Sequence, residues 1–226
     1  MTPQLRGLTA IAALAFPLVT AGQANVPTDW EWRLDGPQTL VTGNGPTDGA
    51  WRYERMPPGW HVTTTSRGVL LWPRGRVVSG RWGIEVSFFL FPDASEEPLG
   101  LVVEGRDAPA GSMQLRFLMR RDGAAALIAR HDGVDTLMVP WTTDSAVPPL
   151  TGPTPVQYTL RLVHEASALA FSVNGHEMLA VPTGGEDHVA TPALRVGPGL
   201  NLHITRFDLI TPLAPARPRP GAGRPD

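Results

Sequence analysis

The stretch that decides the fold is Met113–Val139, which reads MQLRFLMRRDGAAALIARHDGVDTLMV. Its first part alternates between apolar and polar side chains, with the apolar ones at Met113, Leu115, Phe117 and Met119. Two pairs, Asp122-Gly123 and Asp132-Gly133, then separate apolar runs. Asx-Gly favours the type I′ turn, whose two central residues need positive φ and whose twist matches paired strands. The stretch predicts an antiparallel meander of three strands, Met113–Arg121, Ala125–His131 and Thr136–Val139, joined by two type I′ turns.

Short apolar runs bounded by turn residues recur on both sides of the meander, and none shows a sustained 3.6-residue period. They predict further strands at Trp51–Glu54, Trp60–Thr64, Gly68–Trp72, Trp82–Phe91, Leu99–Gly105, Gln157–His164, Ala168–Val173, Glu177–Val181, Ala193–Val196 and Asn201–Ile210. Trp30 and Trp32 indicate one more strand at the start of Asn25–Ala50, ahead of a Gly-, Pro- and Thr-rich loop. Asn174-Gly175 predicts another type I′ hairpin, and a change of phase in the last strand predicts a bulge near Thr205-Arg206.

One-sided apolar alternation is typical of antiparallel sheets that bury a single face. In Trp82–Phe91, for example, Trp82, Ile84 and Val86 share a face while Glu85 and Ser87 share the other. Many such strands pack best as two sheets face to face. The sequence therefore predicts an all-β, two-sheet antiparallel sandwich of the jelly-roll kind with little helix, formed as one domain over residues 51–211.

The two ends of the chain predict segments outside that domain. Arg6 followed by the uncharged apolar run Leu8–Ala21 and by small residues is typical of a secretory signal peptide over residues 1–24, cleaved after Ala24. An uncleaved anchor is the alternative. Cleavage would leave no stable membrane anchor and a periplasmic or extracellular protein. The Pro- and Arg-rich residues 212–226 are expected to be disordered.

Composition excludes several classes of chemistry. The net charge is −2, which argues against an electrostatic grip on nucleic acid. All 19 basic residues are arginine, so a lysine Schiff base or lysine nucleophile cannot form. The chain has no cysteine, which excludes disulfides and lipid attachment through a thiol.

A family resemblance rests on Gln157–Val181, where an alternating strand, a second strand ending in Val-Asn-Gly and a third strand follow one another. This resembles the late part of concanavalin A-like and laminin-G-like jelly rolls. Gly83–Phe91, Leu99–Arg106 and Met113–Gly123 resemble the middle strands of that superfamily, and Gly197–Leu209 its closing strand. Members of this superfamily include sugar-binding lectins, endo-glucanases and interaction modules, so the resemblance leaves the function open.

No catalytic or metal-binding motif is recognisable. Glucanases of this fold carry Glu-x-Asp-x-x-Glu on one strand, whereas Trp82–Phe91 holds only Glu85. Gly-x-Ser-x-Gly and His-x-His are absent too. We therefore assign no catalytic residue, no metal ligand and no cofactor. Calcium stays a family-level possibility, for which the scattered candidate ligands are Asp107, Asp132, Asp187 and Asp208.

One polar set is a candidate binding site, because its members would project together if the polar face of the meander is concave. The set is Glu85, Glu104, Arg106, Gln114, Arg116, Arg120, Arg130 and Trp141. Arginines and carboxylates bind hydroxyls or anionic groups, and a tryptophan stacks on a sugar ring. The alternative interpretation is a solvated sheet face with weak Arg–Glu pairs.

The leading functional prediction is a secreted, non-catalytic domain that binds a carbohydrate or another envelope component. One alternative is a glycoside-cleaving enzyme with an unrecognised pair such as Glu85 and Glu104. Another is a protein-interaction module, which would show an exposed apolar patch or a bare sheet edge.

Overall fold

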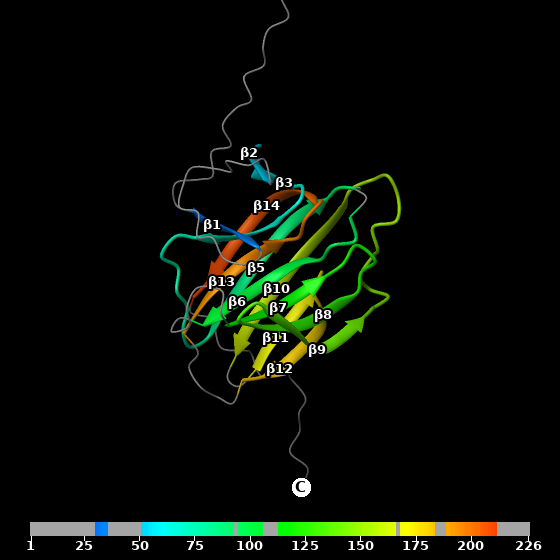
Figure 1. The fold of residues 1–226 in the computed structure, drawn as a ribbon. Helices are drawn as coiled ribbons and strands as arrows, with labels where there is room; N and C mark the ends of the chain where they lie inside the picture. The colour runs from blue at the N-terminus through cyan, green and yellow to red at the C-terminus, as the bar shows by residue number, and fades with distance from the viewer. Residues whose placement is uncertain are drawn as a thin grey trace, which may run out of the picture.

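The structure is a computed structural model, which describes residues 30–35, 51–92, 95–105, 113–165, 168–183 and 189–211. Within these ranges it contains fourteen β-strands and no helix (Figure 1). The strands are β1 Trp30–Asp35, β2 Trp51–Arg55, β3 Trp60–Thr64, β4 Gly68–Pro73, β5 Trp82–Leu90, β6 Leu99–Gly105, β7 Met113–Met119, β8 Ala125–His131, β9 Val134–Thr142, β10 Val156–Glu165, β11 Ala168–Val173, β12 His176–Pro182, β13 Ala190–Val196 and β14 Asn201–Ile210. None of the described segments is a helix long and apolar enough to cross a bilayer.

The strands form two antiparallel sheets of seven strands each. Sheet A has the order β1-β4-β13-β6-β7-β8-β9, and sheet B has the order β12-β11-β10-β5-β14-β3-β2. The predicted all-β sandwich of the jelly-roll kind is confirmed, and every predicted strand corresponds to one of the observed strands. Because β1 pairs with β4, sheet A also includes residues ahead of Trp51. The predicted signal peptide and C-terminal tail lie outside the described residues.

The core lies between the sheets, where the predicted alternation places the apolar side chains. Along β5, Ile84, Val86 and Phe88 are fully buried. Rings from the two sheets meet in this layer: Phe117 of β7 lies 5.9 Å from Phe171 of β11, between ring centroids. Each such aromatic side chain contributes about 1.5–3 kcal/mol through burial.

Two of the three predicted type I′ turns are confirmed. Asp132-Gly133 and Asn174-Gly175 both have positive φ at both residues. The prediction for Asp122-Gly123 is wrong, since only Gly123 has positive φ. The Gly123 N–H donates to the Arg120 carbonyl and the Arg120 N–H to the Ala124 carbonyl, which closes a three-residue loop. Such loops take a type I turn followed by one left-handed residue.

The bulge predicted in the last strand is also present. The pairing of β14 with β5 shifts register between Ile204 and Arg206. One extra residue at this point returns Phe207 to the buried side, where its ring lies 4.7 Å from that of Trp30 in β1. The bulge therefore keeps the apolar side chains of both halves of β14 on the core face.

Candidate functional site

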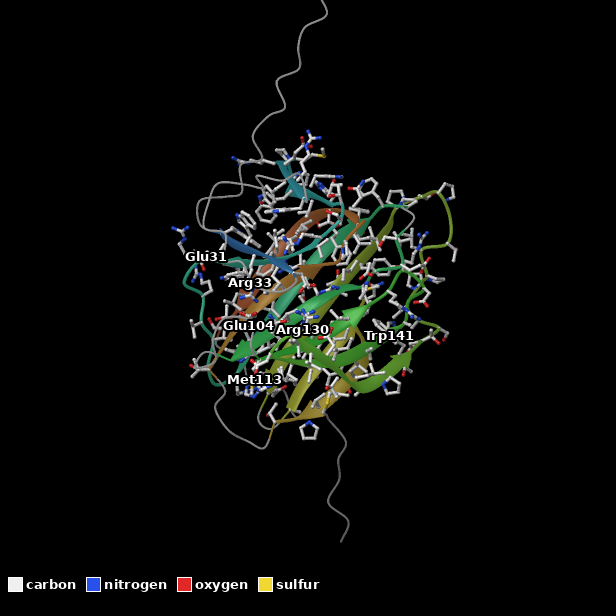
Figure 2. All side chains as sticks on the ribbon, viewed as in Figure 1. Glu31, Arg33, Glu104, Met113, Arg130 and Trp141 are labelled. Atoms are coloured by element: carbon white, nitrogen blue, oxygen red, sulfur yellow. The ribbon has the colours of Figure 1, made fainter. Side chains whose placement is uncertain are left out.

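The structure divides the eight predicted site residues among several places. Glu104, Gln114 and Arg116 lie together with Arg130 on the outer face of sheet A, as Figure 2 shows for Glu104 and Arg130. Arg120 and Trp141 form a separate pair. Arg106 lies outside the described residues.

Glu85 does not join the others, which corrects the expected grouping. It lies on β5 of sheet B and pairs there with Arg161 at 3.6 Å and Arg206 at 3.2 Å. Glu104 lies on β6 of sheet A, so the core separates the two carboxylates. The pair suggested for glycoside cleavage therefore cannot act on one bond, because both groups must flank it.

A set of charged and amide side chains, which we call the arginine cluster, fills the outer face of sheet A. Its members are Arg33, Asp35, Glu104, Gln114, Arg116, Arg130, Asp135 and Arg195. Two guanidinium nitrogens of Arg33 donate to the two oxygens of Glu104. The Gln114 amide also donates to Glu104, and its oxygen accepts from Arg116 Nε at 2.6 Å.

Asp35 is the centre of the arginine cluster. Its carboxylate accepts from Arg195 Nε at 2.6 Å, from Arg116 Nη2 at 2.9 Å and from Arg130 Nη1 at 3.5 Å. Burial alone would raise the pKa of Asp35, but the positive charges of Arg195 and Arg116 outweigh it, and the pKa lies below its usual range. The carboxylate is therefore ionised and fully engaged at neutral pH.

These contacts show that sheet A curls. Asp35 in β1 is four strands away from Arg116 in β7 and five from Arg130 in β8. At about 4.8 Å per strand, a flat sheet would separate them by about 19 Å and about 24 Å. Side chains cannot span such distances, yet the charged groups are in contact. The outer face of sheet A is therefore concave, which was the condition attached to the predicted site.

The middle of the concave side leaves no room for larger side chains at Gly100. A Cβ at Gly100 of β6 would lie 2.1 Å from the Phe117 carbonyl oxygen and 2.8 Å from Leu118 Cα, both in the backbone of β7. Beside the arginine cluster, Leu70, Val102 and Ala193 form a small buried apolar group on this face. The concave face is therefore closely packed near its middle.

The accessible part of this face lies along β8 and β9. Arg130 and Asp135 form a bidentate pair, with Arg130 Nε and Nη2 lying 2.6 and 2.7 Å from the carboxylate oxygens. Their hydrogen bonds raise the pKa of Arg130 and lower the pKa of Asp135. The Asp135 side chain is 42% exposed and that of Arg130 is 19% exposed. This pair is thus the point where solvent or a ligand meets the arginine cluster.

Arg120 and Trp141 occupy the other end of this accessible part. The Arg120 guanidinium carbon lies 4.6 Å from the centroid of the Trp141 ring, and Arg120 also pairs with Asp122. Trp141 lies in β9 between the partners of Leu127 and Ala125. Trp141 therefore lies beside Ala126 of β8, four residues from Arg130, which places it about 14 Å from the Arg130–Asp135 pair at about 3.4 Å per residue. We call this surface the β8–β9 strip; it consists of Arg120, Ile128, Arg130, Asp135, Leu137 and Trp141.

The buried part of the arginine cluster and the β8–β9 strip differ in what they can bind. In the buried zone, Arg33, Gln114 and Arg116 are each only 2% exposed and already bind partners within the protein. The buried part of the cluster is therefore neither an open groove nor a solvated face, the two alternatives that the sequence suggested. Its contacts attach β1 to the strands in the middle of the concave face. The β8–β9 strip offers accessible donors, acceptors, an aromatic ring and apolar surface between them.

Four members of the arginine cluster were missed by sequence reasoning: Arg33, Asp35, Asp135 and Arg195. The alternation of Trp30–Asp35, in which Glu31, Arg33 and Asp35 follow Trp30, Trp32 and Leu34, was a usable signal for outward polar side chains. The partners of Arg33, Asp35 and Arg195 in the cluster lie 71 to 160 residues away along the chain, and no local pattern indicates such pairings. Asp135 is different, because Arg130 lies only five residues away across the predicted Asp132-Gly133 hairpin.

The calcium candidates are not brought together. Asp208 pairs with Arg206 and Asp132 lies next to His131, while Asp107 and Asp187 fall outside the described ranges. Among the described residues, no three His, Cys, Asp or Glu side chains are placed to share a metal ion.

Comparison with known proteins establishes the fold. No protein-family model matches the sequence, and no curated protein sequence matches it. Solved structures do match. The carbohydrate-binding module CBM66 from Bacillus subtilis aligns with a TM-score of 0.52 and 8% identity, over 71% of this chain and 94% of that one.

Two further structures show the same likeness. A glycoside hydrolase family 16 endo-glucanase from Bacteroides ovatus gives a TM-score of 0.54 at 9% identity, over 80% of this chain and 94% of that one. A Bacillus subtilis protein of unknown function with a galectin-like fold gives 0.53 at 14% identity, over 80% and 88%. The chain thus has the concanavalin A-like jelly-roll fold that its sequence resembles.

Proposed function

We propose that this protein is a non-catalytic binding domain that holds a carbohydrate on the β8–β9 strip, as a secreted component of the periplasm or the extracellular space. The observation that carries the proposal is the composition of the strip: the half-buried Trp141 at one end and the accessible Arg130–Asp135 pair at the other. Sugar-binding sites combine an aromatic side chain that packs against a ring with a few charged groups that bind its hydroxyls. The fold supports this proposal, since a carbohydrate-binding module is among its neighbours.

The state of the carboxylates supports binding rather than cleavage. A glycosidase needs one carboxyl group with a raised pKa as the general acid. On the concave face, the pKa values of Asp35 and Asp135 are both lowered, and both groups are bound by arginines. Glu104 is held by Arg33 and Gln114. These three carboxylates are therefore arranged as acceptors and not as proton donors.

The test is a binding assay of the full chain against neutral and acidic oligosaccharides. We expect Trp141→Ala and Arg130→Gln each to weaken binding of the same glycans by about tenfold, the loss of roughly 1–2 kcal/mol. Arg161→Gln, on the opposite face of the sandwich, is the matched control and should bind normally. Absence of binding to every glycan, or binding by both strip variants that equals that of the unmodified chain, would reject the proposal.

A second candidate function, a protein-interaction module, is favoured by the exposed apolar side chains near β9. Met113, Val134, Leu137 and Met138 are 52–68% exposed, and β9 is the last strand of sheet A. However, the pairing of β9 with β8 is irregular at two points, and Pro140 interrupts the donors of the edge. Bulges and prolines protect edges from further pairing. Light scattering of the chain at increasing concentration tests whether these side chains bind a second copy of the same chain. A strictly monomeric result would count against self-association through β9.

A further inference from the structure

The outer face of sheet B carries a pair of histidines that the proposed function does not use. His61 of β3 and His203 of β14 are directly opposite each other in an antiparallel pair. Their ring centroids lie 6.1 Å apart. The neighbours Val62, Leu202 and Ile204 are buried in the core, so alternation directs both histidines outward. The pair is on the opposite side of the sandwich from the arginine cluster.

The hydrogen bonds of His61 define its tautomer. Asn201 Oδ1 accepts a hydrogen bond from the Thr63 hydroxyl and also contacts His61 Nε2. An amide oxygen only accepts, so His61 Nε2 carries the proton. In the neutral ring, His61 Nδ1 then presents a lone pair, and this nitrogen has no hydrogen-bond partner although it is shielded from solvent.

His203 carries a second ring nitrogen without a partner. Its Nδ1 is likewise shielded and has no hydrogen-bond partner. The surrounding groups do not offer either nitrogen a partner: Glu54, opposite His61 in β2, binds Arg52, and the ring of Phe91 lies 5.3 Å from that of His61.

We propose that His61 and His203 form a two-imidazole site for a divalent transition-metal ion, with Zn²⁺ as the representative. Neutral imidazole is a preferred ligand of zinc and copper, and a ligating histidine usually donates its other N–H to a carbonyl oxygen, as His61 does to Asn201. With Zn–N bonds of about 2.1 Å, two imidazoles on one ion have ring centroids about 5.2 Å apart at the tetrahedral angle and about 6.4 Å apart when opposed. The observed 6.1 Å is about 0.9 Å longer than the tetrahedral value, so the two rings would move slightly closer together on binding the ion.

The site offers two protein ligands, since no third acidic or histidine side chain among the described residues is placed to join them. Water would complete the coordination of the ion. The ion would bridge β3 and β14 and satisfy the two nitrogens that now lack partners.

The experiment is calorimetric titration of the untagged full chain with Zn²⁺ alone near neutral pH. We expect binding of a single ion, weakened about tenfold or more in His61→Gln and in His203→Gln. His176→Gln, at the exposed β11–β12 hairpin, is the matched control and should bind as the unmodified chain does. Asn201→Ala should weaken binding by about tenfold through loss of the contact that orients His61.

A second measurement keeps the test decisive if a variant folds poorly. In the unmodified chain, NMR signals of the His61 and His203 rings should shift on Zn²⁺ addition, while those of His131 and His176 stay in place. No Zn²⁺ binding by the chain, or binding that leaves the signals of His61 and His203 unchanged, overturns the proposal.

Discussion

Asp35 and Arg116 are 2.9 Å apart between their charged groups, although four strand spacings of sheet A separate β1 from β7. The contact is possible only because the sheet curls toward its outer side. It attaches the N-terminal strand to the middle of the concave face. The same carboxylate binds Arg195 and Arg130, so a single side chain connects four strands.

Replacing Asp35 tests how much this connection stabilises the fold. In Asp35→Ala, Arg116 and Arg195 would remain buried without their shared carboxylate. Removing one partner of a buried ion pair costs about 3–5 kcal/mol. Chemical denaturation should show a loss of this size, whereas Glu54→Ala, which removes an exposed pair with Arg52, should cost only about 0–1 kcal/mol. Equal losses in the two variants would contradict the central role of Asp35.

The lowered pKa of Asp35 predicts an acid dependence of stability. A carboxyl whose pKa is lower in the folded state contributes stability above its unfolded pKa, about 3.9, and loses that contribution as the pH falls through the folded value. Denaturation curves of the unmodified chain should therefore show decreasing stability below about pH 4. Asp35→Ala should show a flatter decrease in this range, and an unchanged slope would assign the acid dependence to other groups.

Gly100 is predicted to tolerate no side chain. Because a Cβ there would overlap the Phe117 carbonyl oxygen in the neighbouring strand, Gly100→Ala must push β6 and β7 apart. Overpacking of this kind costs about 1–3 kcal/mol. Gly105→Ala, at the other end of β6 with open space around the added atom, is the control. The two melting temperatures would be compared, and equal values would show that the strands are not in close contact at Gly100.

Tyr158 predicts an alkaline transition. Burial, with a smaller effect of Asp122, raises the pKa of Tyr158 to about 12. A group that holds its proton more tightly when folded contributes stability below its unfolded pKa, about 10, and loses it as the pH rises toward about 12. Tyr158→Phe should remove this loss. At neutral pH the variant should be less stable by about 0.5–1.5 kcal/mol, because the hydroxyl donates to the Pro148 carbonyl at 2.6 Å. An alkaline transition that persists unchanged in the variant would contradict this assignment.

Local patterns were reliable where the structure depends on neighbours along the chain. The two hairpins with two-residue loops followed from their Asx-Gly pairs, and the β14 bulge followed from a change of phase. Asp122-Gly123 was misjudged because Arg121 joins the loop. In this loop the Asp122 carboxylate accepts from the Ala124 N–H at 3.0 Å, and only Gly123 has positive φ. Strand ends were also approximate, most visibly for β9, which extends from Val134 to Thr142.

The sequence by itself determined the all-β class, nearly all of the strands and which face of each is apolar. Period-two alternation and turn chemistry are short-range properties that the chain carries in any conformation. Only the tertiary structure decided that Glu85 and Glu104 lie on opposite faces, that Asp35 gathers three arginines, and that His61 lies opposite His203. Those relationships depend on strand order and on the curl of the sheets, which arise when residues far apart in the chain pack together.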